Sequence, residues 1–184
     1  MKKLSLFILV LLAGTFALTT NTSCSGSGSE PLPDDTTDNN PDPVAKVNGF
    51  KIGIDPTYEL DIVEPLTYAV YNKAANKTYV FVSGNDGTKP QNEQDADFGL
   101  EFNTNMMGTY TKNEGARIDV GTGSGIKRIE YTSDGAAITI TVTEYGAVGG
   151  RVKGTFSGTV KAANQVGTVN ITGGFFDVKR IDDE

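Results

Sequence analysis

The chain has 184 residues, carries a formal net charge of −7, and contains one cysteine, no tryptophan and no histidine. The absence of histidine excludes the commonest general base near neutral pH, the Ser-His-Asp and Cys-His arrangements, and the usual zinc sites. The acidic balance argues against nucleic acid, whose binding needs clustered lysine and arginine to displace counterions. We therefore expect no cofactor and no nucleic-acid partner.

The first predicted element is an export signal at residues 1–23. Lys2 and Lys3 precede an uncharged, largely apolar run, Leu4–Leu18, and polar residues follow it. A transmembrane helix needs about 20 apolar residues, whereas a basic start and a shorter apolar run are typical of a cleaved signal peptide. We expect residues 1–23 to be absent from the mature protein, and a retained membrane anchor is the alternative.

The only cysteine, Cys24, directly follows the small residue Ser23 at the end of this signal. The arrangement resembles the lipobox of bacterial lipoproteins, although Asn21 stands where that family most often has an apolar residue. The resemblance implies cleavage between Ser23 and Cys24 and attachment of acyl chains such as palmitate to Cys24. Two or more acyl chains anchor a protein stably to a membrane. The alternative is a secreted protein with a free thiol.

Residues 24–43 are predicted to form a disordered tether. The segment Ser25–Pro43 contains five acidic residues, four prolines and no basic residue, and Leu32 is its only large apolar residue. Such a composition cannot bury enough apolar surface to offset the entropy lost on ordering. A flexible segment of this length spans on the order of 25 Å on average, which would separate an anchored lipid from a folded domain.

Residues 44–184 are predicted to form one domain built entirely from strands. The alternation of apolar and polar residues is clearest in Ala137–Tyr145 and Val152–Val160, and such alternation is typical of half-buried strands. The intervening Gly146–Gly150 predicts a hairpin loop. Weaker strands are predicted at Asn48–Ile54, Leu66–Tyr71, Thr78–Ser83, Phe98–Asn103, Gly108–Lys112, Arg117–Val120 and Ile126–Thr132.

One bulge and two turns are predicted between or within these strands. In Val169–Arg180 the alternation changes phase at Gly173–Gly174, which predicts a β-bulge because one extra residue inverts the side-chain phase. Two short strands joined by a turn are the alternative there. Turns are also predicted at Asn72–Lys77 and at Ser133–Gly135. About ten short strands with glycine-rich turns indicate an antiparallel β-sandwich or a barrel.

Two loops have compositions that could indicate a ligand-binding site. The segment Gly121–Lys127 is rich in glycine but lacks P-loop spacing, and a strand follows it, so it predicts a hairpin turn. The polar stretch Asn85–Asp97 contains Asp86, Asp95 and Asp97, which could offer the oxygen ligands that Ca²⁺ prefers. An ordinary solvated loop is the alternative for that stretch.

A hydrolase would need two carboxylates roughly 5–10 Å apart. None of the acidic residues stands in a distinctive sequence context, and the candidates are Asp86, Asp97, Glu101, Glu130 and Glu144. The domain has tyrosines but no tryptophan, and no row of aromatic residues for binding a carbohydrate is evident. The sequence therefore predicts no catalytic residue.

The last third of the chain has the pattern G-x-F-S-G-T followed by G-x-F-x-V, at Gly154, Phe156, Ser157, Gly158, Thr159, Gly174, Phe176 and Val178. This part resembles the closing hairpins of small exported lipoproteins of the Bacteroidetes. The resemblance implies structural roles for these residues and transfers no catalytic function.

Together these features predict a lipoprotein of the bacterial outer membrane, facing the periplasm or the cell exterior. We expect its β-domain to be a non-catalytic binding module for a polysaccharide, a protein or an envelope component. A purely structural envelope protein is one alternative, and a glycoside hydrolase that uses two carboxylates is another.

Overall fold

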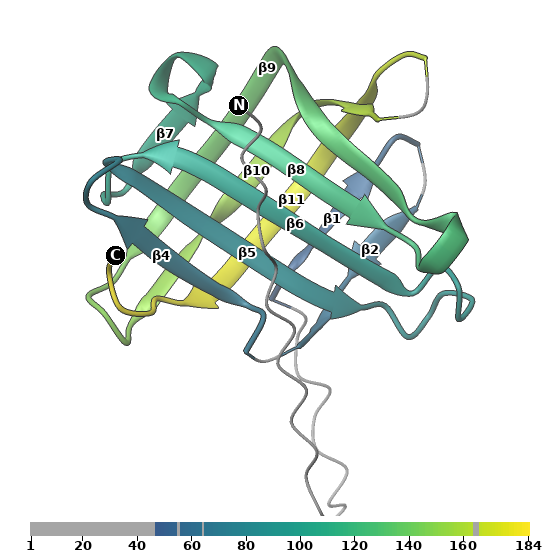
Figure 1. The fold of residues 1–184 in the computed structure, drawn as a ribbon, viewed down its shortest axis with the longest axis horizontal. Coiled ribbons are helices and arrows are strands. Elements are labelled where there is room, and N and C mark those ends of the chain that lie inside the picture. Colours follow the sequence, from purple (N-terminus) through teal and green to yellow (C-terminus); the bar gives the residue numbers. More distant parts are fainter. Residues whose placement is uncertain (1–46, 55, 64, 164–165) are drawn as a thin grey trace, which may run out of the picture. The chain divides into compact units, whose positions relative to one another are not determined.

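In the computed structural model, the described residues form a single, nearly closed, barrel-like antiparallel sheet of 11 strands (Figure 1). The structure describes residues 47–54, 56–63, 65–163 and 166–184. The predicted all-β class is thereby confirmed, in its barrel-like form. The predicted signal peptide, the lipidated Cys24 and the tether lie outside the described residues. Within the described ranges, no helix has both the length and the apolar character needed to cross a membrane.

The strands vary from two to 17 residues in length. In chain order they are β1 (Gly49–Ile52), β2 (Thr57–Glu59), β3 (Asp61–Ile62), β4 (Tyr68–Asn72), β5 (Lys77–Asn85), β6 (Asp95–Asn103), β7 (Gly108–Thr111), β8 (Arg117–Thr122), β9 (Ile129–Tyr145), β10 (Arg151–Ala162) and β11 (Val169–Lys179), with 3₁₀ turns η1 (Lys112–Glu114) and η2 (Gly125–Lys127). In the sheet they follow the order β2-β1-β11-β10-β9-β8-β6-β5-β3, while β4 pairs with β5 and β7 with β9.

Two short segments bring the edges of the sheet together. Strands β2 and β3 are separated only by Leu60, and β2 pairs with β1 whereas β3 pairs with β5. At the other seam, Ala69 of β4 forms a parallel bridge with Arg180 just after β11, and the Ile181 N–H donates to the Ala69 carbonyl at 2.8 Å. The sheet therefore surrounds one core.

Side chains fill the interior, as is usual for a barrel of this size. Phe98 lies at the centre, with its ring 4.7 Å from that of Phe156 and 5.9 Å from that of Phe50. The close packing explains one glycine of the terminal pattern. A Cβ atom on Gly154 would lie 2.7 Å from the ring of Phe176, so only glycine fits beside that ring.

The predicted bulge in the last strand is confirmed. Phe156 pairs with Gly174 and Gly158 pairs with Ile171, so β11 has one more residue than β10 between these two pairs. The backbone of Gly173 has φ +58°, a left-handed conformation that glycine adopts without strain. Strand β11 therefore continues across the change of phase, and the alternative of two strands joined by a turn is wrong.

The predicted turn at residues 133–135 is wrong, because β9 runs through it without reversing. The pairing moves from Ser133 to Ile138 along β9, while along β10 it moves only from Val160 to Gly158. Strand β9 also pairs with β8 before this irregularity and with β7 after it. Because β9 has a neighbouring strand on each edge, its turn-forming residues produce an irregularity in the strand and not a chain reversal. The predicted hairpin connection at Gly121–Lys127 is confirmed between β8 and β9.

Candidate ligand-binding site at the barrel mouth

Four connections meet at one end of the barrel, on the right in Figure 1: β1–β2, β5–β6, β8–β9 and β10–β11. Backbone hydrogen bonds join them. The Gly53 N–H donates to the Asn170 carbonyl at 2.8 Å, and the Ser124 N–H donates to the Asn92 carbonyl at 3.2 Å. These bonds link segments from distant parts of the chain, and we call this end of the barrel the mouth.

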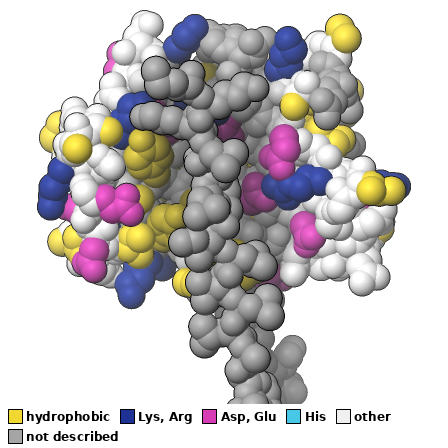
Figure 2. All heavy atoms as spheres, in the orientation of Figure 1, with side chains coloured by type: hydrophobic (Ala, Val, Ile, Leu, Met, Phe, Trp, Pro, Cys, Tyr) yellow, Lys and Arg dark blue, Asp and Glu magenta, His cyan; other side chains and the backbone are white. Residues whose placement is uncertain are grey.

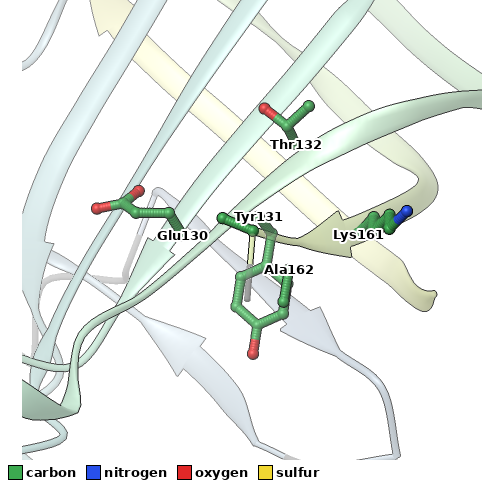
Figure 3. A pocket seen from close by; sticks show the side chains of 6 residues that line it. Glu130, Tyr131, Thr132, Lys161 and Ala162 are labelled. Carbon is green, nitrogen blue, oxygen red and sulfur yellow. The ribbon is translucent and has the colours of Figure 1, made fainter. Parts of the chain in front are cut away.

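The mouth contains a hollow of about 350 Å³, within the usual size range of small-molecule pockets. Its walls are mostly apolar and include Pro56, Ile129 and Val169, with Tyr58 and Tyr131 from the two sides. A second hollow of about 300 Å³ lies between the β9 and β10 segments around Tyr131 and Ala162 (Figure 3). Tyr131 lines both hollows.

Tyr58 is a rigid part of this site. It is buried, its ring stacks on that of Phe50 with 5.3 Å between centroids, and Lys89 Nζ lies 5.4 Å from the ring centroid. Burial raises the pKa of Tyr58 above its usual value, against a smaller opposite effect of the hydrogen bond with Thr122. Tyr58 therefore remains a neutral phenol near neutral pH.

Tyr131 is the second aromatic side chain of the site. It is half-buried and packs against the core, and in Figure 3 its ring projects to the same side as Ala162, away from Glu130, Thr132 and Lys161. Its hydroxyl makes no hydrogen bond with any other residue that the structure describes. Because the residue is only half-buried, this hydroxyl can form a hydrogen bond with water or with a ligand in the hollow.

An apolar rim surrounds the mouth. Ile54, Ile126 and Val166 lie on three different connections and are 87%, 105% and 107% exposed. Single exposed aliphatic residues are common on protein surfaces, and these three provide apolar area beside the opening. Glu93 and Lys127 line the same hollow and form no ion pair with another described residue, so each of them can offer a charge to a ligand.

The three residues of the predicted calcium loop are not brought together. Strand β5 reaches Asn85 and β6 begins at Asp95, so the loop is shorter than predicted. The Asp86 carboxylate accepts hydrogen bonds from the Thr88 hydroxyl at 2.6 Å and from the Glu59 N–H at 3.2 Å. Asp97 lies in β6 and contacts a guanidinium group. Among the described residues, no group of three potential ligands is placed to hold a metal ion.

The electrostatic environment of Asp86 reflects these contacts. Burial raises the pKa of the carboxyl group, but the hydrogen bonds from the side chain and backbone of Thr88 and from the Glu59 backbone outweigh it. Lys89, 3.9 Å away, adds a smaller effect in the same direction. The pKa of Asp86 therefore lies below its ordinary value, and the charged form stabilises the β5–β6 loop.

The acidic residues considered for hydrolysis form ion pairs. Asp97 lies 2.6 Å from Arg128, which also contacts Glu130, and Glu101 contacts Lys77. Burial raises the pKa of Asp97, although Arg128 opposes the rise. A glycosidase needs one carboxylic acid and one separate carboxylate on either side of its substrate. The Asp97–Arg128–Glu130 cluster does not provide that arrangement.

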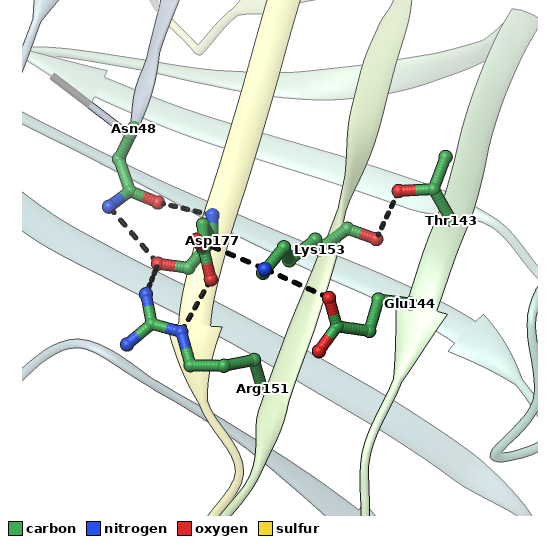
Figure 4. Close-up of polar contacts among 6 residues, drawn as sticks. All are labelled: Asn48, Thr143, Glu144, Arg151, Lys153 and Asp177. Carbon is green, nitrogen blue, oxygen red and sulfur yellow. Dashed lines mark hydrogen bonds and ion pairs between the residues drawn. The ribbon is translucent and has the colours of Figure 1, made fainter. Parts of the chain in front are cut away.

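Glu144 belongs to a polar ladder on the outer surface of β9, β10 and β11 (Figure 4). Lys153 Nζ lies 2.9 Å from Glu144 and 3.8 Å from Asp177, and Asp177 also pairs with Arg151 at 2.5 Å. The buried Asn48 side chain accepts from the Asp177 N–H at 2.9 Å, extending the pairing of β1 with β11. Exposed pairs of this kind contribute up to about 1 kcal/mol each, so the ladder favours the strand register.

Comparison of the chain with protein families, with curated proteins and with solved structures finds no match in any of the three. Function is therefore inferred from the geometry of the molecule. The sequence pattern does not single out Tyr58, Glu93, Lys127 or Tyr131, because they come from four separate segments that only the closed sheet brings together.

Proposed function

We propose that this protein is a lipoprotein of the bacterial outer membrane whose barrel binds a ligand at the mouth without catalysing a reaction. The observation that carries the binding function is that Tyr131 lines two hollows and that its hydroxyl has no hydrogen-bond partner among the described residues. The pattern of residues 1–24 supports the anchor, since an apolar run of signal-peptide length ends at the only cysteine. In this proposal Cys24 carries the lipid and the barrel faces the periplasm or the cell exterior.

The chemistry of the mouth favours a ligand with an apolar body and one polar group. Tyr58, Ile129 and the rim residues would cover the apolar body, and removal of apolar surface from water contributes roughly 25 cal/mol per Å². The Tyr131 hydroxyl can donate or accept a hydrogen bond. Glu93 and Lys127 would orient a dipolar or charged end.

The binding function is tested by thermal unfolding of the purified full-length chain in detergent with peptidoglycan fragments, glycans, peptides and lipids. A ligand at about 100 times its Kd adds roughly 2.7 kcal/mol to stability, enough to raise the midpoint by several degrees. We expect one ligand class to raise it, Tyr131→Phe to reduce the shift and Tyr131→Ala to abolish it. Thr141→Val, on the outer surface of β9, is the matched control.

Two outcomes would contradict this site. One is a ligand-induced shift that is equal in the wild type and in Tyr131→Ala, which would place the ligand elsewhere. The other is the absence of a shift with every class, which would favour a purely structural envelope protein.

The anchor is tested separately with Cys24→Ser in cells labelled with a palmitate analogue. We expect the substituted chain to lose the label, whereas Ser25→Ala should be labelled like the wild type. A Cys24→Ser chain that keeps the label would contradict acylation at Cys24.

A further inference from the structure

A strip of aromatic side chains runs along the outer surface of β4 and β5, away from the mouth. Tyr68 of β4 lies directly opposite Phe81 of β5, with ring centroids 6.3 Å apart, and Tyr79 follows on the same face of β5. Phe81 is 36% exposed. Figure 2 shows hydrophobic side chains gathered on the left, over β4 and β5. We call Tyr68, Tyr79 and Phe81 the aromatic strip.

A glycine leaves one side of this strip uncovered. Gly99 of β6 is the cross-strand partner of Phe81, and a Cβ atom at this position would meet only the Phe81 ring, at 3.9 Å. Almost any other strand residue would cover that ring. The result is a surface hollow of about 340 Å³. Glycine is unfavourable inside a strand, and where it forms no bulge or bend it can mark a place where a ligand or another backbone approaches closely.

Carboxylates lie along the same hollow. Glu101 follows Gly99 on the outer face of β6, and Asp119 is the cross-strand partner of Gly99 in β8. Both are held by neighbouring cations, Glu101 by Lys77 and Asp119 by Arg117 at 2.9 Å. A carboxylate has about four acceptor positions, so each group retains acceptor capacity toward a ligand hydroxyl.

We propose that the aromatic strip binds a neutral polysaccharide chain. A sugar ring has an apolar C–H face and a rim of hydroxyl groups, and the strip offers aromatic faces beside fixed acceptors. Aromatic rings provide large apolar contact area at low entropic cost, and hydrogen bonds to charged acceptors are the stronger ones. The strip follows β5 on an open surface, which suits a chain with several contacting units.

The charge balance of the hollow decides between the possible occupants. Lys77 and Arg117 pair with Glu101 and Asp119, and Glu184 also lines the hollow, so the hollow offers no excess of basic residues. Anionic glycans and the anionic headgroups of a lipid surface are attracted by such an excess, whereas a neutral chain does not need it. This binding site is separate from the mouth, so the inference goes beyond the proposed function and does not rest on it.

The test is affinity electrophoresis of the full-length chain in gels containing laminarin, mannan, xylan or hydroxyethylcellulose, with alginate as the anionic comparison. We expect at least one neutral polysaccharide to retard the wild type and alginate not to. Phe81→Ala and Tyr68→Ala should each weaken the binding by about tenfold, because each removes a stacking face.

Gly99→Val is the most informative variant. Its side chain would cover the Phe81 ring and fill the hollow, while valine suits an exposed strand position with room for a Cβ atom. We expect this variant to unfold at the wild-type temperature or above it and to lose polysaccharide binding. Thr141→Val on β9 and Tyr131→Ala at the mouth should retain it, which separates this site from the mouth.

Four results would overturn the proposal. The first is that no neutral polysaccharide retards the wild type, and the second is that Gly99→Val binds as the wild type does. The third is that alginate or phosphatidylglycerol vesicles bind and Phe81→Ala abolishes that binding, which would make the strip a surface for anions or lipids. The fourth is that light scattering shows a dimer that Phe81→Ala dissociates, since a second copy would then occupy the strip.

Discussion

Strand β9 carries a tyrosine at each end of the barrel, and the two tyrosines have opposite environments. At the closed end, the Tyr145 hydroxyl lies 2.7 Å from the Thr78 hydroxyl, and the Arg180 guanidinium lies 4.9 Å from its ring centroid. At the mouth, Tyr131 has neither a hydrogen-bond partner nor a covering cation among the described residues. The same residue type on one strand is thus structural at one end and available to a ligand at the other.

The difference arises from what each end uses to close the sheet. At the closed end, Arg180 donates to the Gly146 carbonyl at 2.8 Å and pairs with Asp183 at 2.6 Å, joining the β9–β10 loop to the segment beside β4. At the mouth, backbone hydrogen bonds join the connections, and side chains add the contacts of Asp86 with Thr88 and Glu59 and the cation–π contact of Lys89 with Tyr58. Arg180 thus links two segments beside Tyr145, whereas no described side chain bonds to the hydroxyl of Tyr131 beside the mouth hollow.

The largest effect is expected from breaking the closed end with Arg180→Leu. The substitution removes two hydrogen bonds of a buried charge and a cation–π contact, so unfolding free energy should fall by about 3 kcal/mol. Urea unfolding measures this loss. Arg151→Leu removes an exposed ion pair and should cost less than about 1 kcal/mol. Equal losses for the two variants would show that Arg180 does not hold the end closed.

A smaller effect is expected at the mouth from Asp86→Asn, which removes the charge that the Thr88 and Glu59 donors face. We expect a loss of about 1–2 kcal/mol near neutral pH. Because the folded-state pKa of Asp86 is lowered, its contribution is complete above the unfolded value of about 3.9 and disappears as the pH falls below it.

The measurement is urea unfolding of wild type and Asp86→Asn at neutral pH and at about pH 2–3, below the ordinary aspartate pKa. The difference between them should shrink at the lower pH. Asp95→Asn, at an exposed position of β6, should change stability by less than about 0.5 kcal/mol. A difference that persists in acid would mean that the Asp86 charge is not what stabilises the loop.

The smallest expected changes in stability come from removing the hydroxyl groups of Tyr145 and Tyr131. Tyr145→Phe loses the hydrogen bond with Thr78 and should destabilise the fold by about 1 kcal/mol. Tyr131→Phe loses no internal bond and should change stability by less than about 0.5 kcal/mol. Unfolding curves of the two variants, recorded side by side, test this contrast. A loss at Tyr131 as large as at Tyr145 would mean that the mouth hydroxyl has a structural partner.

Much of the sheet was predictable because side-chain alternation is a local property. The strands at β9, β10 and β11, the loop between β9 and β10, and the bulge at Gly173 all follow from patterns within a dozen residues. The turn predicted at residues 133–135 was wrong because the same residues form a turn or a bulge depending on the neighbouring strands. Strands β2 and β3 are too short to show a period.

The two binding surfaces differ in how far the sequence could reveal them. Tyr68 and Phe81 belong to the predicted hairpin of β4 and β5, so the correct pairing register would have placed them opposite each other. The exposure of Phe81, however, depends on Gly99 in the next strand of the sheet. Tyr58 and Tyr131 line the same hollow only because β2 and the beginning of β9 lie at the same end of the barrel. No local pattern contains that information.

The sequence by itself determined the strand-forming segments, the glycine positions that allow bulges and close packing, and the acidic surface, because these depend on residues near one another in the chain. It also carries the pattern that predicts an anchored Cys24. Only the tertiary structure decided which end of the barrel is closed by Arg180 and which keeps a pocket at Tyr131. The reason is that both ends are built from segments far apart in sequence, and the closure of the sheet sets their distances.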